Sequence, residues 1–182
     1  MRPDESCVLD VVRYPQRFAP DEWPAGAVLA GEGAQHWSDR ACGLACLRMV
    51  FDHFGLPVPS QWELLVEALE LDAYTPRGWK HQGLADLAVR RGLVAVPLAI
   101  GGVDELHALL RGGGPVIVSV THELPVDGRR GGHLVVVAGV RIPEHEVVFR
   151  DPSRWGGENS VVPAERFVQS FSGRGIAFSR AT

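Results

Sequence analysis

The pattern of hydrophobic and polar positions divides the chain into a helical half followed by a half rich in strands. Apolar residues recur at helical spacing through 41–54 and lie nearly all round the helix that they predict. Ser38 or Asp39 is expected to cap this helix, and Gly55 to end it. A helix that is apolar on so many sides is expected to be central and buried.

Three further helices are expected in the first two thirds of the chain. Ser60 and Glu63 have the spacing of a capping box, which predicts a helix over the apolar face that follows. The segment 73–83 is interpreted as a linker to a helix over 84–92, and a short helix is expected over 104–114 with a glycine stop.

The β-rich runs lie mostly in the C-terminal half. Strands are expected over 93–100, 115–121, 133–142, 145–152 and 175–180, with a helical turn within 161–171. Pro97 confines the first of these strands toward a sheet edge. The runs 133–142 and 145–152 are expected to form an antiparallel hairpin, because a short Pro-containing turn joins them. The fold class predicted is α+β.

The chain is expected to form one domain, because 182 residues lie within the usual size range of domains. Residues 1–34 are rich in Pro, Gly and Asp, with a short apolar run that predicts an edge strand. We expect 1–34 to be a lead-in packed on a single domain over 35–182.

Composition and charge exclude several classes of partner. A formal net charge of −4 provides no electrostatic footprint for nucleic acid. The longest apolar runs have the length of strands, far short of the ~20 residues of a membrane span, and the N-terminus lacks a secretory h-region. Three cysteines, an odd number, indicate reduced thiols rather than a disulfide framework, so we expect a cytoplasmic location.

Cys42 is a candidate nucleophile because it lies where the apolar helix begins. The free N–H groups and the positive end of the helix dipole favour a thiolate over a thiol at that position. The alternative is that Cys42 is a small buried apolar residue of the helix.

His133 opens one strand of the expected hairpin, and Asp151 ends the other. If the loop comprises 141–143, Val140 pairs with Glu144 and His133 falls directly opposite Asp151, within reach of a hydrogen bond. A one-residue slip would put the two side chains on opposite faces. Each residue alone is also explained as a strand-end or turn residue.

The three residues together supply the groups of a thiol-dependent acyl transfer. A thiolate attacks a carbonyl carbon, the imidazole moves the proton, and the carboxylate orients the imidazole. The oxyanion requires donors, for which Gln35 or His36 is a candidate together with the backbone N–H of Cys42.

The segments QHWSDRACGLACLRMVFDHFG, HQGLADLAVRRGL, GGGPVIVSV, GGHLVVVAGV and VVFRDPS resemble the C39-like cysteine peptidase family of the papain-like superfamily, over roughly residues 35–172. The resemblance implies a papain-like fold, with an N-terminal helical half packed on a C-terminal antiparallel sheet. It also implies Cys42 as nucleophile, His133 as base, Asp151 as third member and Gln35 as oxyanion donor. Family members commonly place the glutamine six residues before the cysteine, where this chain has His36.

The resemblance also places the segment around Trp79, His81 and Gln82 beside the substrate cleft, where these residues are candidates for substrate binding. A linker whose Trp packs on the core explains them as well. His122, in the long loop before His133, is a further candidate for the rim of the cleft.

Cys42 and Cys46 are spaced as two metal ligands on one face of a helix would be, but no second pair completes a site. No metal or organic cofactor is therefore expected.

The function that the sequence predicts is that of a thiol hydrolase, which cleaves a peptide or amide bond of its substrate through an acyl-enzyme on Cys42. The alternative is an acyltransferase that uses the same triad and passes the acyl group to an amine. A third hypothesis is a non-catalytic module that binds a peptide. A crowded, apolar cleft would favour transfer, and an open, polar one hydrolysis.

Overall fold

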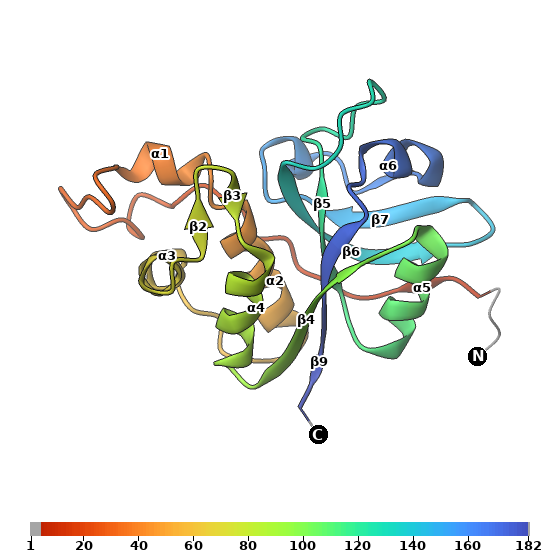
Figure 1. The fold of residues 1–182 in the computed structure, drawn as a ribbon, viewed down its shortest axis with the longest axis horizontal. Helices are drawn as coiled ribbons and strands as arrows, with labels where there is room; N and C mark the ends of the chain where they lie inside the picture. Colours follow the sequence, from red (N-terminus) through yellow and green to blue (C-terminus); the bar gives the residue numbers. More distant parts are fainter. Residues whose placement is uncertain (1–4, 182) are drawn as a thin grey trace.

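The computed structural model describes residues 5–181 and contains a helical part and a large antiparallel sheet (Figure 1). The helices are α1 (Ala34–Ser38), α2 (Cys42–His53), α3 (Gln61–Glu70), α4 (His81–Val89), α5 (Val103–Gly112) and α6 (Ala164–Ser170), with a 3-10 turn η1 (Trp155–Gly157). The strands are β1 (Cys7–Val8), β2 (Tyr74–Thr75), β3 (Gly78–Trp79), β4 (Leu93–Ala99), β5 (Val116–Val120), β6 (His133–Arg141), β7 (Glu146–Arg150), β8 (Val161–Pro163) and β9 (Arg174–Arg180).

The main sheet has the strand order β4-β9-β5-β6-β7-β8, and every pairing in it is antiparallel. The short β1 pairs with the C-terminal end of β6, and β2 and β3 form a separate hairpin. Figure 1 shows α1 to α4 gathered on one side of the molecule, with α5 and α6 beside the strands. Strand β4 lies at the sheet edge, as its proline predicted.

The centre of the sheet is buried on both faces, which explains the unbroken apolar run in β6. One face packs on α2 and α4 through residues that include Leu134, Val136 and Phe178, and α3 packs against these two helices. The other face packs on α5 and α6, with Val135 and Phe149 in its core. Strand β6 therefore lies at the centre of the domain. The buried side chains along the strand fix its backbone, including that of its first residue, His133.

Helix α2 starts later than the sequence predicted. Its N-cap is Ala41, which makes no side-chain cap, so the expected cap at Ser38 or Asp39 is wrong. Ser38 instead ends the short helix α1, and its hydroxyl accepts a hydrogen bond from the Phe18 N–H at 3.1 Å. The capping box of α3 is confirmed, with Ser60 and Glu63 bonded reciprocally. The expected linker 73–83 contains the β2–β3 hairpin, which the sequence did not predict.

The predicted register of the β6–β7 hairpin is also wrong. Val140 pairs with Val147, not with Glu144, because the connection is a turn over 142–145 that the His145 N–H closes by donating to the Ile142 carbonyl at 3.3 Å. The register then shifts by one residue at a β-bulge between Val137 and Gly139.

Candidate active site

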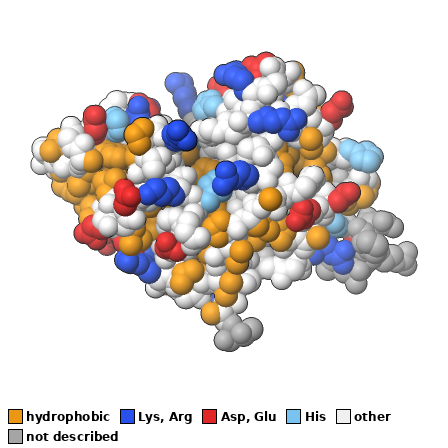
Figure 2. Space-filling view, viewed as in Figure 1, with side chains coloured by type: hydrophobic (Ala, Val, Ile, Leu, Met, Phe, Trp, Pro, Cys, Tyr) orange, Lys and Arg blue, Asp and Glu red, His pale blue; other side chains and the backbone are white. Residues whose placement is uncertain are grey.

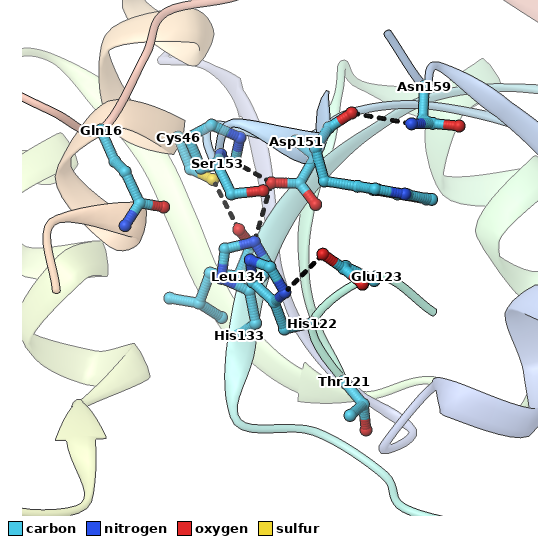
Figure 3. A network of polar contacts seen from close by, with 12 residues as sticks. Gln16, Cys46, Thr121, His122, Glu123, His133, Leu134, Asp151, Ser153 and Asn159 are labelled. Atoms are coloured by element: carbon cyan, nitrogen blue, oxygen red, sulfur yellow. Dashed lines mark hydrogen bonds and ion pairs between the residues drawn. The ribbon is translucent and has the colours of Figure 1, made fainter. Parts of the chain in front are cut away.

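His133 and Asp151 form a buried hydrogen-bonded pair at the open end of β6 and β7. The His133 Nε2 atom lies 2.8 Å from Asp151 Oδ1, and the two residues are 7% and 1% exposed. The same Oδ1 atom accepts a hydrogen bond from the Ser153 N–H at 2.7 Å. Figure 3 shows the carboxylate of Asp151 held between Ser153 and the His133 ring. Because Nε2 is engaged by the carboxylate, Nδ1 is the ring nitrogen that remains for other contacts.

The electrostatics of this pair favour the ion pair. Burial lowers the pKa of His133, but hydrogen bonds to Asp151 and Cys42 and the negative charges of both outweigh it, and the pKa rises from 6.5 to about 10. Burial raises the pKa of Asp151, but its interactions with His133 and Ser153 outweigh this and hold the pKa below 3.8. The imidazolium and the carboxylate are therefore both favoured at neutral pH.

Cys42 is the first residue of α2, where the N–H groups of the first turn have no partner within the helix. The side chain is half-buried and borders the cleft that contains His133. The turn before it is fixed by Trp79, whose indole N–H donates to the Arg40 carbonyl at 2.7 Å. A Cβ on Gly43 would lie 3.0 Å from the Trp79 and Leu84 side chains, so glycine allows the close packing of α2 against them.

The turn that carries Asp151 is held from two sides. Arg13, in the segment before α1, donates from Nε to the Asp151 carbonyl at 2.6 Å and from Nη2 to the Ser153 carbonyl at 2.5 Å. On the other side, a Cβ on Gly156 would stand 2.0 Å from the Asp151 carbonyl oxygen, so no larger residue fits there. The sequence did not identify either residue, because neither belongs to a local motif with Asp151.

Neither of the expected oxyanion donors lies at the cleft. Gln35 is exposed, and its amide donates to Asp39 at 2.8 Å and accepts from Arg17 at 2.9 Å. The His36 Nδ1 atom lies 3.3 Å from a carboxylate oxygen of Glu32. Both side chains extend from α1 toward surface partners.

Gln16 lines the cleft together with Cys42 and is 8% exposed. Its Nε2 donates to the Ser38 carbonyl at 3.0 Å, while its Oε1 is buried without a hydrogen-bond partner among residues 5–181. The Gln16 backbone is fixed as well, since its N–H donates to the Pro152 carbonyl at 2.9 Å. No sequence spacing links Gln16 to Cys42, so only the three-dimensional structure identifies it.

The remaining candidates divide into those at the cleft and one elsewhere. Trp79, His81 and His122 line the cleft. The centroids of the His122 and His133 rings are 5.0 Å apart, and Figure 3 shows the two rings side by side. Gln82 does not line the cleft, and its amide donates to Asp86 on the exposed side of α4 at 2.8 Å.

Cys46 is a buried residue of the hydrophobic core and does not line the cleft with Cys42. It is fully buried, and its sulfur lies 3.4 Å from the Leu134 carbonyl. Burial, and then the charges of Cys42 and Asp151, raise the pKa of Cys46 well above 9.0. Within residues 5–181, no cluster of three or more His, Cys, Asp or Glu side chains is arranged to hold a metal ion.

A cysteine at the start of a buried helix that faces a His–Asp pair on an antiparallel sheet is the arrangement of the papain-like cysteine proteases. The model of the family described as papain-like cysteine protease AvrRpt2 matches residues 35–172. Because the match spans most of the chain, the protein belongs to that family. No curated protein matches this sequence.

Solved structures show the same fold. A double glycine motif protease from an AMS/PCAT transporter, in complex with its leader peptide, is 20% identical with a TM-score of 0.63, over 96% of this chain and 95% of that one. The peptidase domain of Streptococcus ComA, a bifunctional ABC transporter, is 23% identical with a TM-score of 0.59, over 79% and 93%. A putative C39-like peptidase from Bacillus anthracis is 20% identical with a TM-score of 0.60, over 79% and 90%. The resemblance to C39-like peptidases and the predicted α+β papain-like fold are therefore confirmed.

Proposed function

We propose that the protein is a thiol hydrolase that cleaves a peptide or amide bond through an acyl-enzyme on Cys42. The observation that carries this proposal is the buried His133–Asp151 pair, 2.8 Å apart, at a cleft that Cys42 also lines. Family membership supports cysteine protease chemistry.

The Nδ1 atom of His133 carries out the proton transfers of the reaction, because Nε2 is bonded to Asp151. The Cys42 thiolate attacks the carbonyl carbon, a C–S bond forms, and the carbonyl oxygen takes up the electron pair. His133 then gives its Nδ1 proton to the leaving nitrogen as the C–N bond breaks. In the second half, His133 takes a proton from water, the resulting hydroxide attacks the acyl carbon, and the thiolate leaves. Asp151 keeps Nε2 protonated throughout.

The oxyanion hole of this proposal consists of the Cys42 backbone N–H and the Gln16 side-chain amide. One Nε2 hydrogen of Gln16 is engaged by Ser38, and the other is available to the cleft. Gln16 thereby takes the role that the sequence gave to Gln35 or His36. We also propose that the segment before α1 is an integral part of the domain, because Arg13 and Gln16 both support the site.

Hydrolysis is favoured over acyl transfer by the character of the cleft. Charged side chains such as Arg77, Lys80 and Arg154 line it, and all three are exposed to water. A site that protects an acyl-enzyme from hydrolysis would need to exclude water.

None of the helices in residues 5–181 has the length and hydrophobicity that crossing a bilayer requires. A cytoplasmic location stays a prediction.

The test is digestion of a proteome-derived peptide mixture in H₂¹⁸O, read by mass spectrometry. Hydrolysis places ¹⁸O in each new carboxyl terminus, whereas transfer to an amine produces a new amide without ¹⁸O. We expect ¹⁸O-labelled products with wild type and with the control variant Cys7→Ala, and none with Cys42→Ala. Cleavage that persists in Cys42→Ala, or no product with wild type, would overturn the proposal.

A further inference from the structure

The cleft beside Cys42 is strongly basic, although the chain as a whole carries a net charge of −4. Its volume is about 850 Å³, and Asp39 is the single acid among the described residues that line it. Basic side chains come from both walls: Arg17, Arg40, Arg77 and Lys80 from the helical half, and Arg130, Arg154 and Arg174 from the strand half. Figure 2 shows Lys and Arg side chains around the hollow between the two halves.

Two of these charges are balanced by carboxylates. Arg17 lies 3.6 Å from Asp39, and Lys80 lies 2.7 Å from Asp72. Asp39, the one acid of the cleft, is therefore already paired. It contributes no uncompensated negative charge.

The other basic groups have no carboxylate partner in the described part of the chain. Arg40 donates to the His36 carbonyl at 3.1 Å, and Arg130 donates to the Phe171 carbonyl at 3.1 Å, so both keep their full charge. The side chains of Arg77, Arg154 and Arg174 are exposed and make neither a hydrogen bond nor an ion pair within residues 5–181. These three are the guanidinium groups that remain available to a ligand.

One of these arginines, Arg174, also acts on a neighbouring histidine. Burial, and then the charge of Arg174, lower the pKa of His81, which lines the same cleft. The unpaired arginines of the cleft favour a bound anion, because the low-dielectric walls focus the field of these fixed charges.

We propose that the cleft selects acidic peptide segments, whose Asp and Glu side chains bind the guanidinium groups of Arg77, Arg154 and Arg174. This inference rests on the proposed function, which makes a peptide the occupant of the cleft. A guanidinium group binds a carboxylate through two parallel hydrogen bonds, so unpaired arginines on both walls provide selectivity as well as attraction. Basic peptides are repelled by the same groups.

The test uses Cys42→Ala, immobilised and exposed to a randomised decapeptide library with equal shares of acidic and basic residues. Retained peptides are sequenced by mass spectrometry at low and at high salt. The same measurement is made with Arg77→Gln/Arg154→Gln added, and with Arg90→Gln/Arg141→Gln as a control that removes the same charge outside the cleft.

We expect Asp and Glu to be enriched at low salt and the enrichment to fall as salt rises. Loss of Arg77 and Arg154 should weaken retention of acidic peptides about tenfold, as expected for the loss of one or two charge-assisted contacts, and the control should not. Equal retention of acidic and basic peptides, or a cleft variant that binds like the control, overturns the inference. The binding measurement does not need catalysis, so it is independent of the proposed function. If the proposed function alone is wrong, wild type forms no ¹⁸O product, but acidic peptides still bind.

Discussion

The His133 Nε2 atom lies 2.8 Å from Asp151 Oδ1, although the two residues are not directly opposite each other across the hairpin. The pairing of Val136 with Arg150, continued by one step, puts Asp151 opposite Val135, two positions from His133. A displacement of two keeps side chains on one face, and the diagonal is within reach of a His–Asp contact. Without the bulge between Val137 and Gly139 the displacement would be three, and the side chains would lie on opposite faces.

We predict that the Asp151 oxygen that accepts from His133 contributes more to activity than the charge of Asp151 does. Asp151→Asn keeps an acceptor at Oδ1 for both His133 and Ser153, whereas Asp151→Ala removes it. We expect kcat/KM to fall about 10²-fold in the Ala variant and less than about tenfold in the Asn variant. Steady-state kinetics on a peptide found in the ¹⁸O digestion measures both. Equal losses in the two variants would show that the charge, not the acceptor, is decisive.

The stability of the protein should depend on pH through the same pair. The pKa of His133 is raised from 6.5 to about 10, so the stabilisation is complete below pH 6.5 and is lost as the pH rises toward 10. The lowered pKa of Asp151 gives the opposite dependence in acid, where stabilisation is lost as the pH falls below 3.8. Urea unfolding of wild type and His133→Gln measures the difference in free energy of unfolding. We expect that difference to shrink between pH 6.5 and 10; a constant difference would contradict the assigned ion pair.

Gly156 should be essential for the position of Asp151. Gly156→Ala puts a Cβ 2.0 Å from the Asp151 carbonyl oxygen and forces the turn to move. We expect a loss of about 1–3 kcal/mol in the free energy of unfolding, with a fall in kcat/KM. Gly157→Ala is the matched control, because a Cβ there meets no atom within 4 Å. Similar behaviour of the two variants in thermal unfolding and kinetics would refute the assigned role.

The oxyanion donor can be identified by comparing two glutamines. Gln16→Ala should lower kcat about 10²-fold, the usual effect of removing one oxyanion donor, and should leave KM nearly unchanged. Gln35→Ala should have little effect, because its amide is bonded to Asp39 and Arg17 on the surface. The reverse ranking of the two variants would restore the sequence-based assignment.

Much of the fold was predictable because hydrophobic periodicity and capping signals are local. The capping box at Ser60 and Glu63, the edge position of β4 and the β6–β7 hairpin are all confirmed. The start of α2 was not predictable in the same way, since Ala41 carries no capping side chain and the turn before Cys42 is fixed by Trp79.

The details of the site that the sequence missed depend on contacts between distant segments. The hairpin register depends on the turn at 142–145 and on a bulge, neither of which has a clear sequence signal. Arg13 and Gln16 reach the site through bonds to Asp151, Ser38 and neighbouring backbone. Gly156 is required only because the Asp151 carbonyl lies against it. The role of such residues can be identified only from the three-dimensional structure.

The most direct test of the central claim is the rate of iodoacetamide labelling at Cys42 as a function of pH, in wild type and in His133→Ala. Mass spectrometry reads each cysteine separately, with half-buried Cys7 as the accessible reference and buried Cys46 as the protected one. A thiolate paired with His133 should react at pH 5 to 6 at least about tenfold faster than Cys7 and lose that advantage in His133→Ala. If Cys42 titrates like a free thiol near ~8.5 and does not respond to the loss of His133, the catalytic assignment is contradicted.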